Sequence, residues 1–264
     1  MKLYHITDPH FNFKSQAEVK LFGEQVKESC SQEEVKVVVL TGDISKARSL
    51  SRDLESFSIP FKYTDVQIFF VLGNHDFYGG WMAGTLRKAE QRSGYLPALD
   101  FAHLSEEVAL CGVDGWYDFR AGVGSSTTAD MSDWKQIRDM RDLTWTSLVD
   151  GCRALAKDSA QKAIKKLEAA ARSGYKKLVL ATHVPPFEGA VCGSPLEPDL
   201  LPVVTNITLG EHLLEFTQAH PEVQVNVLCG HTHYERSVQV TANLNVHVGK
   251  AKYGELYPVL REFS

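Results

Sequence analysis

The sequence Val-Gln-Ile-Phe-Phe-Val-Leu-Gly-Asn-His-Asp at residues 66–76 joins an apolar run to a group of polar side chains. Its first seven residues are almost all apolar, which is typical of a strand that is covered on both faces in an α/β protein. Residues 73–76 follow directly, where such a strand would end. Because sheets of this kind bind their ligands at the carboxyl ends of the strands, this polar segment is expected to belong to a functional site.

Four further apolar runs end in polar residues of the same kinds. Each run leads to aspartate or histidine: residues 2–7 to Asp8 and His10, residues 35–41 to Asp43, residues 177–182 to His183, and residues 223–229 to His231 and His233. In two of these runs the polar residues are two positions apart, so in an extended chain their side chains point to the same face. Five strands would therefore bring Asp, Asn and His side chains to one edge of a sheet.

Helix patterns alternate with the first three apolar runs. Ser15 and Glu18 match a capping box at the start of a helix, and a second helix pattern stops at Pro60. This β-α-β-α-β order indicates parallel strands joined by right-handed crossovers. In the last third of the chain, Thr208 and Glu211 match another capping box. Three later runs are expected to form antiparallel strands, at residues 235–240, 244–248 and 257–260.

The stretch between Asp76 and His183 is too long for a single crossover. An insert is therefore expected at about residues 77–176, within one domain that spans residues 1–264. The insert has helix patterns at residues 81–93 and 159–172 and short strand-like pieces at 99–104 and 108–113. Residues 114–130 are rich in Gly, Ser and Thr and are expected to form a surface loop.

The amino-acid composition argues against several classes of protein. The net charge is −5 and there is no basic cluster, which argues against a broad nucleic-acid surface. No apolar stretch approaches the roughly 18 residues that would span a bilayer. The five cysteines are widely spaced and include no Cys-x-x-Cys pair, so a disulfide framework or a zinc ribbon is not expected. Buried thiols of this kind suit a reducing compartment, and a cytoplasmic protein is expected.

The residue types at the strand ends indicate a metal site. Mixed Asp, His and Asn ligands without thiolate suit Mn, Fe or Zn. Two such divalent ions, held roughly 3.5–4 Å apart and bridged by a carboxylate and a hydroxide, favour in-line displacement at phosphorus. Phosphoester hydrolysis is therefore the expected chemistry, with two divalent metal ions as cofactors.

Five motifs carry a family resemblance: Asp-x-His at residues 8–10, Gly-Asp at 42–43, Gly-Asn-His-Asp at 73–76, His183 before Val-Pro-Pro, and Gly-His-x-His at 230–233. In this order they resemble the calcineurin-like metallophosphoesterase family. The resemblance implies an α/β fold, a four-layer sandwich of two mixed β-sheets flanked by helices. One departure is that Ile44-Ser45-Lys46 follows Gly-Asp, whereas many relatives carry an acidic residue there, which leaves the subfamily open.

The resemblance also implies a role for each residue of these motifs. It assigns one metal ion to Asp8, His10, Asp43 and His233, and the other to Asp43, Asn74, His183 and His231. Asp43 would bridge the two ions, and the bridging hydroxide would attack phosphorus in line. His75 would protonate the leaving oxygen or stabilise the charged phosphoryl group, and Asp76 would orient His75.

Substrate contacts are expected from residues outside these motifs. Trp116, Tyr117 and Arg120 join aromatic faces to a guanidinium, which could stack on a ring and pair with a phosphate. A locally packed loop with a surface arginine explains the same residues equally well. Tyr78 is the candidate nearest to the motif at residues 73–76. The remaining histidines are expected to be structural or solvent-exposed: His5, His103, His212, His220 and His247.

Three functions from different classes fit these observations. The leading one is hydrolysis of a small-molecule phosphomonoester or phosphodiester. A nuclease is the first alternative, although the acidic net charge argues against nucleic acid as a partner. The second alternative is a non-catalytic interaction scaffold on the same fold, which would require loss of ligands or of the catalytic histidine. The sequence does not indicate an oligomeric state.

Overall fold

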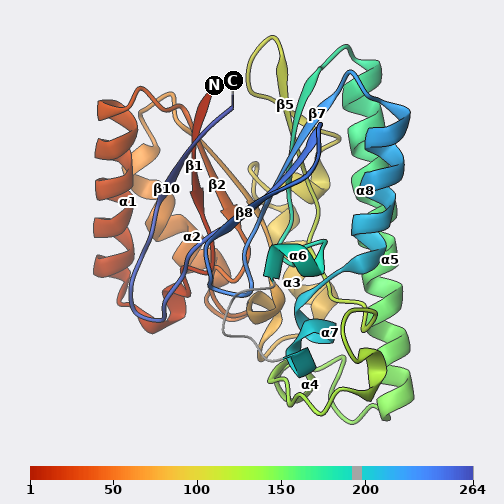
Figure 1. Cartoon of the computed structure of the whole chain (residues 1–264). Coiled ribbons are helices and arrows are strands. Elements are labelled where there is room, and N and C mark those ends of the chain that lie inside the picture. The colour runs from red at the N-terminus through yellow and green to blue at the C-terminus, as the bar shows by residue number, and fades with distance from the viewer. Residues whose placement is uncertain (192–197, 264) are drawn as a thin grey trace.

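Two mixed β-sheets lie face to face between two layers of helices (Figure 1). The structure is a computed structural model, and it describes residues 1–191 and 198–263. This arrangement confirms the α/β sandwich that the family resemblance implies. The single-domain organisation stays a prediction.

The first sheet has the strand order β10-β1-β2-β3. Its strands are β1 (Lys2–Ile6), β2 (Val37–Thr41), β3 (Gln67–Val71) and β10 (Val259–Glu262). The first three run parallel, and β10 is antiparallel to β1. Because side chains alternate along a strand, Val38 and Leu40 face the helices while Val37 and Val39 face the second sheet.

The second sheet has the order β4-β5-β6-β7-β9-β8. Its strands are β4 (Ala102–His103), β5 (Val108–Gly112), β6 (Lys177–Ala181), β7 (Gln224–Cys229), β8 (Arg236–Thr241) and β9 (Leu244–Val248). The middle four are parallel, whereas β4 and β8 are antiparallel edge strands. The expectation of antiparallel strands is confirmed for β8 with β9 and for β10 with β1, and β9 in addition pairs in parallel with β7 on its other side.

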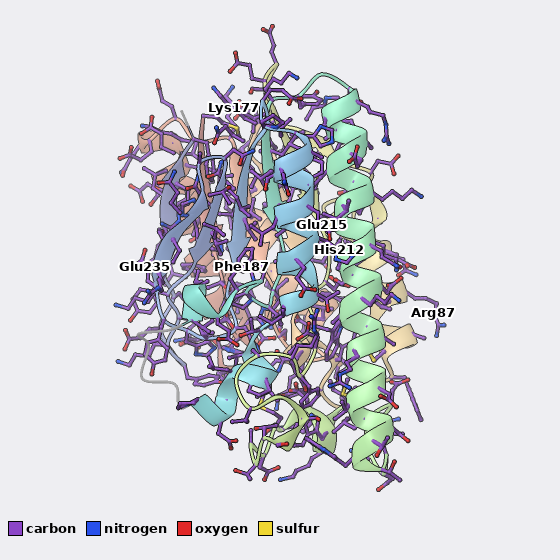
Figure 2. The ribbon with its side chains drawn as sticks, turned by 45° about the vertical axis from the view of Figure 1, so that its right-hand side comes forward. Arg87, Lys177, Phe187, His212, Glu215 and Glu235 are labelled. Carbon is purple, nitrogen blue, oxygen red and sulfur yellow. The ribbon has the colours of Figure 1, made fainter. Side chains whose placement is uncertain are left out.

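Two helices cover the outer face of each sheet. On the first sheet these are α1 (Gln16–Gln32), with the expected capping box at Ser15 and Glu18, and α2 (Leu50–Ser58). On the second they are α5 (Trp145–Arg172) and α8 (Ile207–Ala219). Figure 2 brings α5 and α8 forward, side by side, with His212 and Glu215 labelled on α8.

The remaining helices are short and lie in the connections. The α-helices are α3 (Met82–Glu90), α4 (Asp133–Gln136), α6 (Glu188–Val191) and α7 (Leu201–Val204). The 3-10 helices are η1 (Phe11–Phe13), η2 (Ile59–Phe61), η3 (Asn74–Phe77), η4 (Leu96–Ala98), η5 (Gly124–Ser126) and η6 (Pro198–Leu200). No helix among the described residues is both long and apolar enough to cross a bilayer.

Several local expectations need correction. The Thr208/Glu211 capping box is wrong, because Asn206 caps α8 and its side chain accepts the Leu209 N–H at 2.9 Å. Residues 77–176 are more than an insert on a finished core, since they supply β4, β5 and α5 to the second sheet and its outer layer. The helix expected at residues 159–172 is the second half of the longer α5.

The thiols are buried as expected. Cys30, Cys111, Cys152 and Cys229 are free and buried, and Cys192 lies outside the described residues. Burial raises the pKa of the Cys30 thiol to about 11 and that of Cys111 to about 12. These thiols therefore behave as small apolar side chains.

Candidate metal and catalytic site

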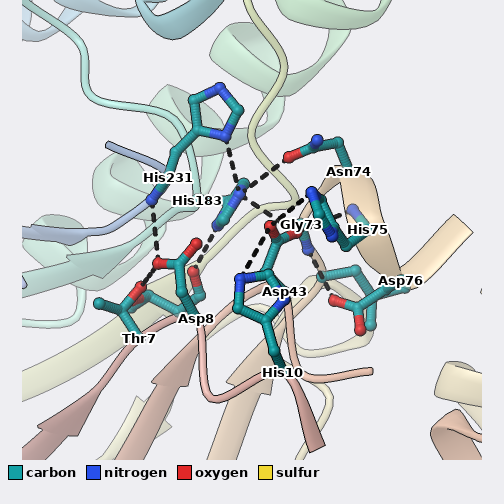
Figure 3. Close-up of polar contacts among 12 residues, drawn as sticks. Thr7, Asp8, His10, Asp43, Gly73, Asn74, His75, Asp76, His183 and His231 are labelled. Atoms are coloured by element: carbon teal, nitrogen blue, oxygen red, sulfur yellow. Dashed lines mark hydrogen bonds and ion pairs between the residues drawn. The ribbon is translucent and has the colours of Figure 1, made fainter. Parts of the chain in front are cut away.

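The candidate metal ligands meet where strands of both sheets end (Figure 3). The first sheet supplies Asp8, His10, Asp43 and Asn74 after β1, β2 and β3, and the second supplies His183, His231 and His233 after β6 and β7. The site is therefore complete only where the two sheets face each other.

The backbone is strained at most of these positions. Eight described residues other than glycine have a positive φ. Five of the eight are candidate ligands: Asp8 (49°), His10 (43°), Asp43 (52°), His231 (69°) and His233 (63°). This conformation costs of order 1–3 kcal/mol per residue and persists only where the surrounding structure imposes it. The concentration of strain at these strand ends is typical of a functional site.

Gly73 allows the ends of β2 and β3 to approach closely. A Cβ at this position would lie 2.6 Å from the backbone nitrogen of Asp43. The backbone N–H of His75 donates to Asp43 Oδ1 at 2.8 Å. The missing side chain thus brings the Gly-Asn-His-Asp motif into direct contact with Asp43.

The donor atoms form overlapping groups. Within the described residues, three groups have ligand atoms that all lie within 4.8 Å of one another: Asp8 with His10 and His233, Asp43 with His183 and His231, and His10 with Asp43 and His75. Asp43 lies between the two ends of the site, because Oδ1 is 3.3 Å from His183 Nε2 and Oδ2 is 4.0 Å from His10 Nε2. This geometry suits a carboxylate that serves two cations.

Hydrogen bonds fix which ring nitrogen faces the site. His183 Nδ1 donates to the Thr41 carbonyl at 2.8 Å, and His231 Nε2 donates to the Val203 carbonyl at 3.0 Å. The other nitrogens, His183 Nε2 and His231 Nδ1, face each other 3.2 Å apart as acceptors. Histidines that bind metals are held in this way by the N–H on the far side of the ring.

The charges at the site also favour cations. Asp8 and Asp43 are 1% and 2% exposed, and isolated buried carboxylates are costly unless a cation compensates them. Burial, and then the Asp8 carboxylate, raises the pKa of Asp43. Burial also lowers the pKa of His10 and of His183 to about 3, so both imidazoles are neutral and able to bind a metal. The residues present therefore fit divalent metal ions.

His75 lies at the rim of the site. Its ring stacks on Tyr78 with centroids 4.2 Å apart, and its Nε2 lies 3.8 Å from Asp43 Oδ2. Asp76 does not orient this ring as expected, because its carboxylate accepts the backbone N–H groups of Gly73 at 2.9 Å and Ser45 at 2.7 Å. Asp76 therefore joins two loops beneath the site.

Asp133 is a site residue that no sequence motif marks. It is fully buried and accepts hydrogen bonds from Asn74 Nδ2 at 2.7 Å, from the Tyr117 hydroxyl at 2.9 Å and from the Tyr78 hydroxyl. Because the Asn74 amide nitrogen is held, its Oδ1 points at His183 Nε2, 3.1 Å away. In the sequence, Asp133 resembles an ordinary acidic residue at the start of a helix, so no local pattern identifies it.

Asp133→Asn is expected to weaken divalent-metal binding about 10- to 100-fold, the usual effect of losing a residue that orients a ligand. The reason is that a neutral amide accepts fewer hydrogen bonds and releases the Asn74 side chain. Calorimetric titration of Mn²⁺ into chelator-treated protein measures the affinity. Asp130→Asn is the matched control, because Asp130 is exposed and pairs with Lys135. Unchanged affinity in a folded Asp133 variant would show that Asn74 does not depend on it.

The aromatic substrate candidates are buried. Residues 114–130 were expected to form a surface loop, but Trp116, Tyr117 and Phe119 are 4%, 0% and 1% exposed. Trp116 packs against Phe77 at 5.6 Å, and the Tyr117 ring lies 6.4 Å from that of His231. The surface-loop expectation holds for most of residues 122–130 and is wrong for these three residues, whose large aromatic side chains are buried in the core.

Arg120 forms an ion pair with Glu211. Its guanidinium makes two hydrogen bonds to the Glu211 carboxylate, at 2.6 and 2.7 Å, and a third to Thr208 at 3.3 Å. This pairing raises the pKa of Arg120 further. The positive charge expected to meet a substrate phosphate is thus already paired within the protein, and Arg120 is better explained as a link from residues 114–130 to α8.

Tyr253 also lies at the site, although no sequence motif marks it. Its ring lies 4.6 Å from that of His10 and 5.1 Å from that of His233. Partial desolvation of its half-exposed side chain, followed by the carboxylates of Asp43 and Asp8, raises the pKa of Tyr253 to about 12. It comes from the segment between β9 and β10, which showed no motif in the sequence.

The other histidines bond groups outside the metal cluster. Their partners are Thr41 for His5, Tyr175 for His103, the Thr208 carbonyl for His212, Glu168 for His220, and Asn226 for His247. These contacts agree with the structural role expected for the five.

Comparison with known protein families identifies one match. The family model described as calcineurin-like phosphoesterase matches residues 1–235, which includes all five motifs. A comparison with curated proteins finds no match.

Solved structures share the fold at low sequence identity. A dimetal phosphatase from Danio rerio superposes with a TM-score of 0.57 and 14% identity, over 94% of this chain and 86% of that chain. The protein TT1561 of Thermus thermophilus gives 0.54 and 12%, over 94% and 89%. A 5'-nucleotidase from Candida albicans gives 0.52 and 11%, over 94% of this chain but only 46% of the other. At these identities the likeness establishes the fold alone.

Proposed function

Because the chain belongs to the calcineurin-like phosphoesterase family, we propose that it is a binuclear metal-dependent enzyme that hydrolyses a small-molecule phosphomonoester or phosphodiester. This proposal rests on the position of Asp43. Its Oδ2 faces His10 of the first sheet, and its Oδ1 faces His183 of the second sheet. A single carboxylate in this position can hold two cations at bridging distance.

Two divalent ions, Mn, Fe or Zn, would be held by the residues at the strand ends. We assign Asp8, His10, Asp43 and His233 to one ion, and Asp43, Asn74, His183 and His231 to the other. When bound, such ions polarise the phosphoryl group and lower the pKa of water. The metal identity follows availability in the cell as much as the ligands.

The chain's own residues would position the ester and handle the proton. The His75 side chain is 19% exposed beside Asp43, within reach of an ester whose phosphate is bound by the metal ions. Its Nδ1 has no hydrogen-bond partner among the described residues. We assign His75 to protonate the leaving oxygen or to stabilise the charged phosphoryl group. Tyr78 would keep the His75 ring in place by stacking.

The test is a panel of a phosphomonoester, a phosphodiester, a cyclic nucleotide and single-stranded DNA, each with Mn²⁺ or with a chelator. We expect the small esters to be hydrolysed only with metal. The site is lined by carboxylate, amide and imidazole groups that accept hydrogen bonds, so it needs cations to bind an anionic phosphate ester. Cleavage of DNA without hydrolysis of the small esters would identify a nuclease instead. Metal binding without hydrolysis of any substrate would identify a scaffold.

A further inference from the structure

Two aromatic side chains stand exposed beside the metal cluster. Phe13 is 57% exposed and Tyr253 is 54% exposed. Their rings meet edge to face, with centroids 5.6 Å apart and planes at 83°. Phe13 ends η1, directly after the Asp-x-His motif, whereas Tyr253 lies between β9 and β10. Segments far apart in the sequence thus place two aromatic rings together at the rim of the site.

The pair begins at the candidate ligands and extends outward. The Tyr253 ring lies 4.6 Å from the His10 ring at an angle of 32°, and 6.5 Å from the ring of His75. The Phe13 ring lies 6.2 Å from that of His10. An ester whose phosphate reaches these imidazoles would have its organic group within reach of both aromatic rings.

Hydrogen bonds hold the segment that carries Tyr253. Lys14 Nζ donates to the Gly254 carbonyl at 2.6 Å, which ties this segment to the residue next to Phe13. The Ala251 N–H donates to the His233 carbonyl at 3.1 Å. Gly254 has a φ of 82°, which permits the turn that these bonds require. The two rings are therefore positioned before any ligand arrives.

Packing does not explain why these rings face solvent. Single exposed apolar residues are common on protein surfaces, but adjacent exposed aromatic residues beside a polar cluster indicate a binding surface. Aromatic rings prefer other planar rings, by stacking or by edge-to-face contact. The site therefore offers metal ligands for an anion and, beside them, a surface suited to a flat apolar group.

Resting on the phosphoesterase function proposed above, we propose that Phe13 and Tyr253 form an aromatic wall that binds a planar aromatic group of the substrate. The preferred substrates are then phosphate esters whose organic part carries such a ring. A simple aryl group and a nucleobase share this chemistry. The wall replaces Trp116 and Arg120 as the surface that selects among phosphate esters.

The test uses two matched pairs of substrates. Benzyl phosphate and cyclohexylmethyl phosphate have similar leaving groups and differ in the flat ring, while adenosine monophosphate and ribose 5-phosphate differ in the base. We expect kcat/KM to favour the aromatic member about 3- to 10-fold in the first pair and about 5- to 100-fold in the second. If the enzyme prefers diesters, the methyl esters of the same four compounds are used.

Variants separate the flat ring from simple apolar bulk. The double variant Phe13→Leu with Tyr253→Leu is expected to bring the ratio within each pair close to one, because leucine is apolar but not planar. Tyr253→Phe keeps the ring and is expected to keep the preference. Tyr63→Leu is the matched control, since Tyr63 is 91% exposed and precedes β3. Metal content and melting temperature are measured on every sample, and rates are compared at equal metal content.

The outcomes distinguish this inference from the proposed function. Loss of the preference for the aromatic substrate in the double variant supports the aromatic wall. The substrate pair in which wild type shows that preference identifies the bound ring as an aryl group or a nucleobase. If all four esters are hydrolysed with ratios near one, or if the double variant keeps the wild-type ratios, the wall is wrong and the phosphoesterase function stands. If metal-loaded protein hydrolyses none of the four esters, both the aromatic wall and the proposed phosphoesterase function are wrong.

Discussion

Asp43→Asn is expected to reduce phosphoester hydrolysis at least about 10³-fold and to release one or both metal ions. Removing the shared carboxylate affects both cations, and their charge stabilisation of the transition state is worth several kcal/mol. The other six candidate ligands each belong to one end of the site, so none of them should have so large an effect.

Asp43→Asn should make the metal-free protein more stable. Asp43 is a buried carboxylate beside a second one, Asp8, and an uncompensated buried charge destabilises the folded state. Asparagine removes that charge and can still accept the His75 N–H. We therefore expect the metal-free variant to melt a few degrees higher than metal-free wild type. With metal, the order should reverse.

Two measurements on the same samples check this prediction. Elemental analysis gives the metal content per chain, and thermal melting with and without chelator gives the two stabilities. Asp130→Asn again serves as the control, because it removes an exposed carboxylate. A variant that keeps two metal ions and wild-type turnover would show that Asp43 does not bridge them.

His75→Ala is expected to lower turnover about 10²- to 10⁴-fold while the metal content stays unchanged, the usual effect of removing a positioned general acid. The expectation assumes that His75 acts on the substrate. The structure also allows a competing role, because His75 can join His10 and Asp43 around a cation. Turnover and metal content must therefore be measured on one preparation.

The leaving group separates the two roles of His75. An ester with a very acidic leaving alcohol needs little protonation, so its hydrolysis should be less affected by His75→Ala. His220→Ala is a suitable control, because His220 pairs with Glu168 in the layer of α5 and α8. Loss of metal together with activity would make His75 a ligand and would overturn the assignment.

Sequence patterns predicted the parts of the site that depend on single strands. Each candidate ligand follows an apolar run, and the rule that parallel strands end at one edge brings Asp8, Asp43 and Asn74 together. That rule does not predict how the strands of the second sheet pair. Strand β5 lies within the stretch interpreted as an insert, and only the family resemblance implied two sheets.

The errors arose where long-range contacts override local patterns. Thr208 and Glu211 have capping-box spacing, but Glu211 binds Arg120, 91 positions away in the chain. Asp133 acquires its role from Asn74, 59 positions away. No window of sequence contains both partners of such a contact, so its existence can be seen only once the chain is folded.

Because both sheets contribute to one site, metal ions bound there would affect the stability of the protein as well as its chemistry. A cation that binds only when both halves are in place stabilises the whole fold, by about 2.7 kcal/mol at a free concentration 100 times its dissociation constant. Scarcity of metal would then shorten the lifetime of the chain, because unfolded chains are open to proteases. The amount of enzyme in a cell, and not only its rate, would follow the supply of divalent ions.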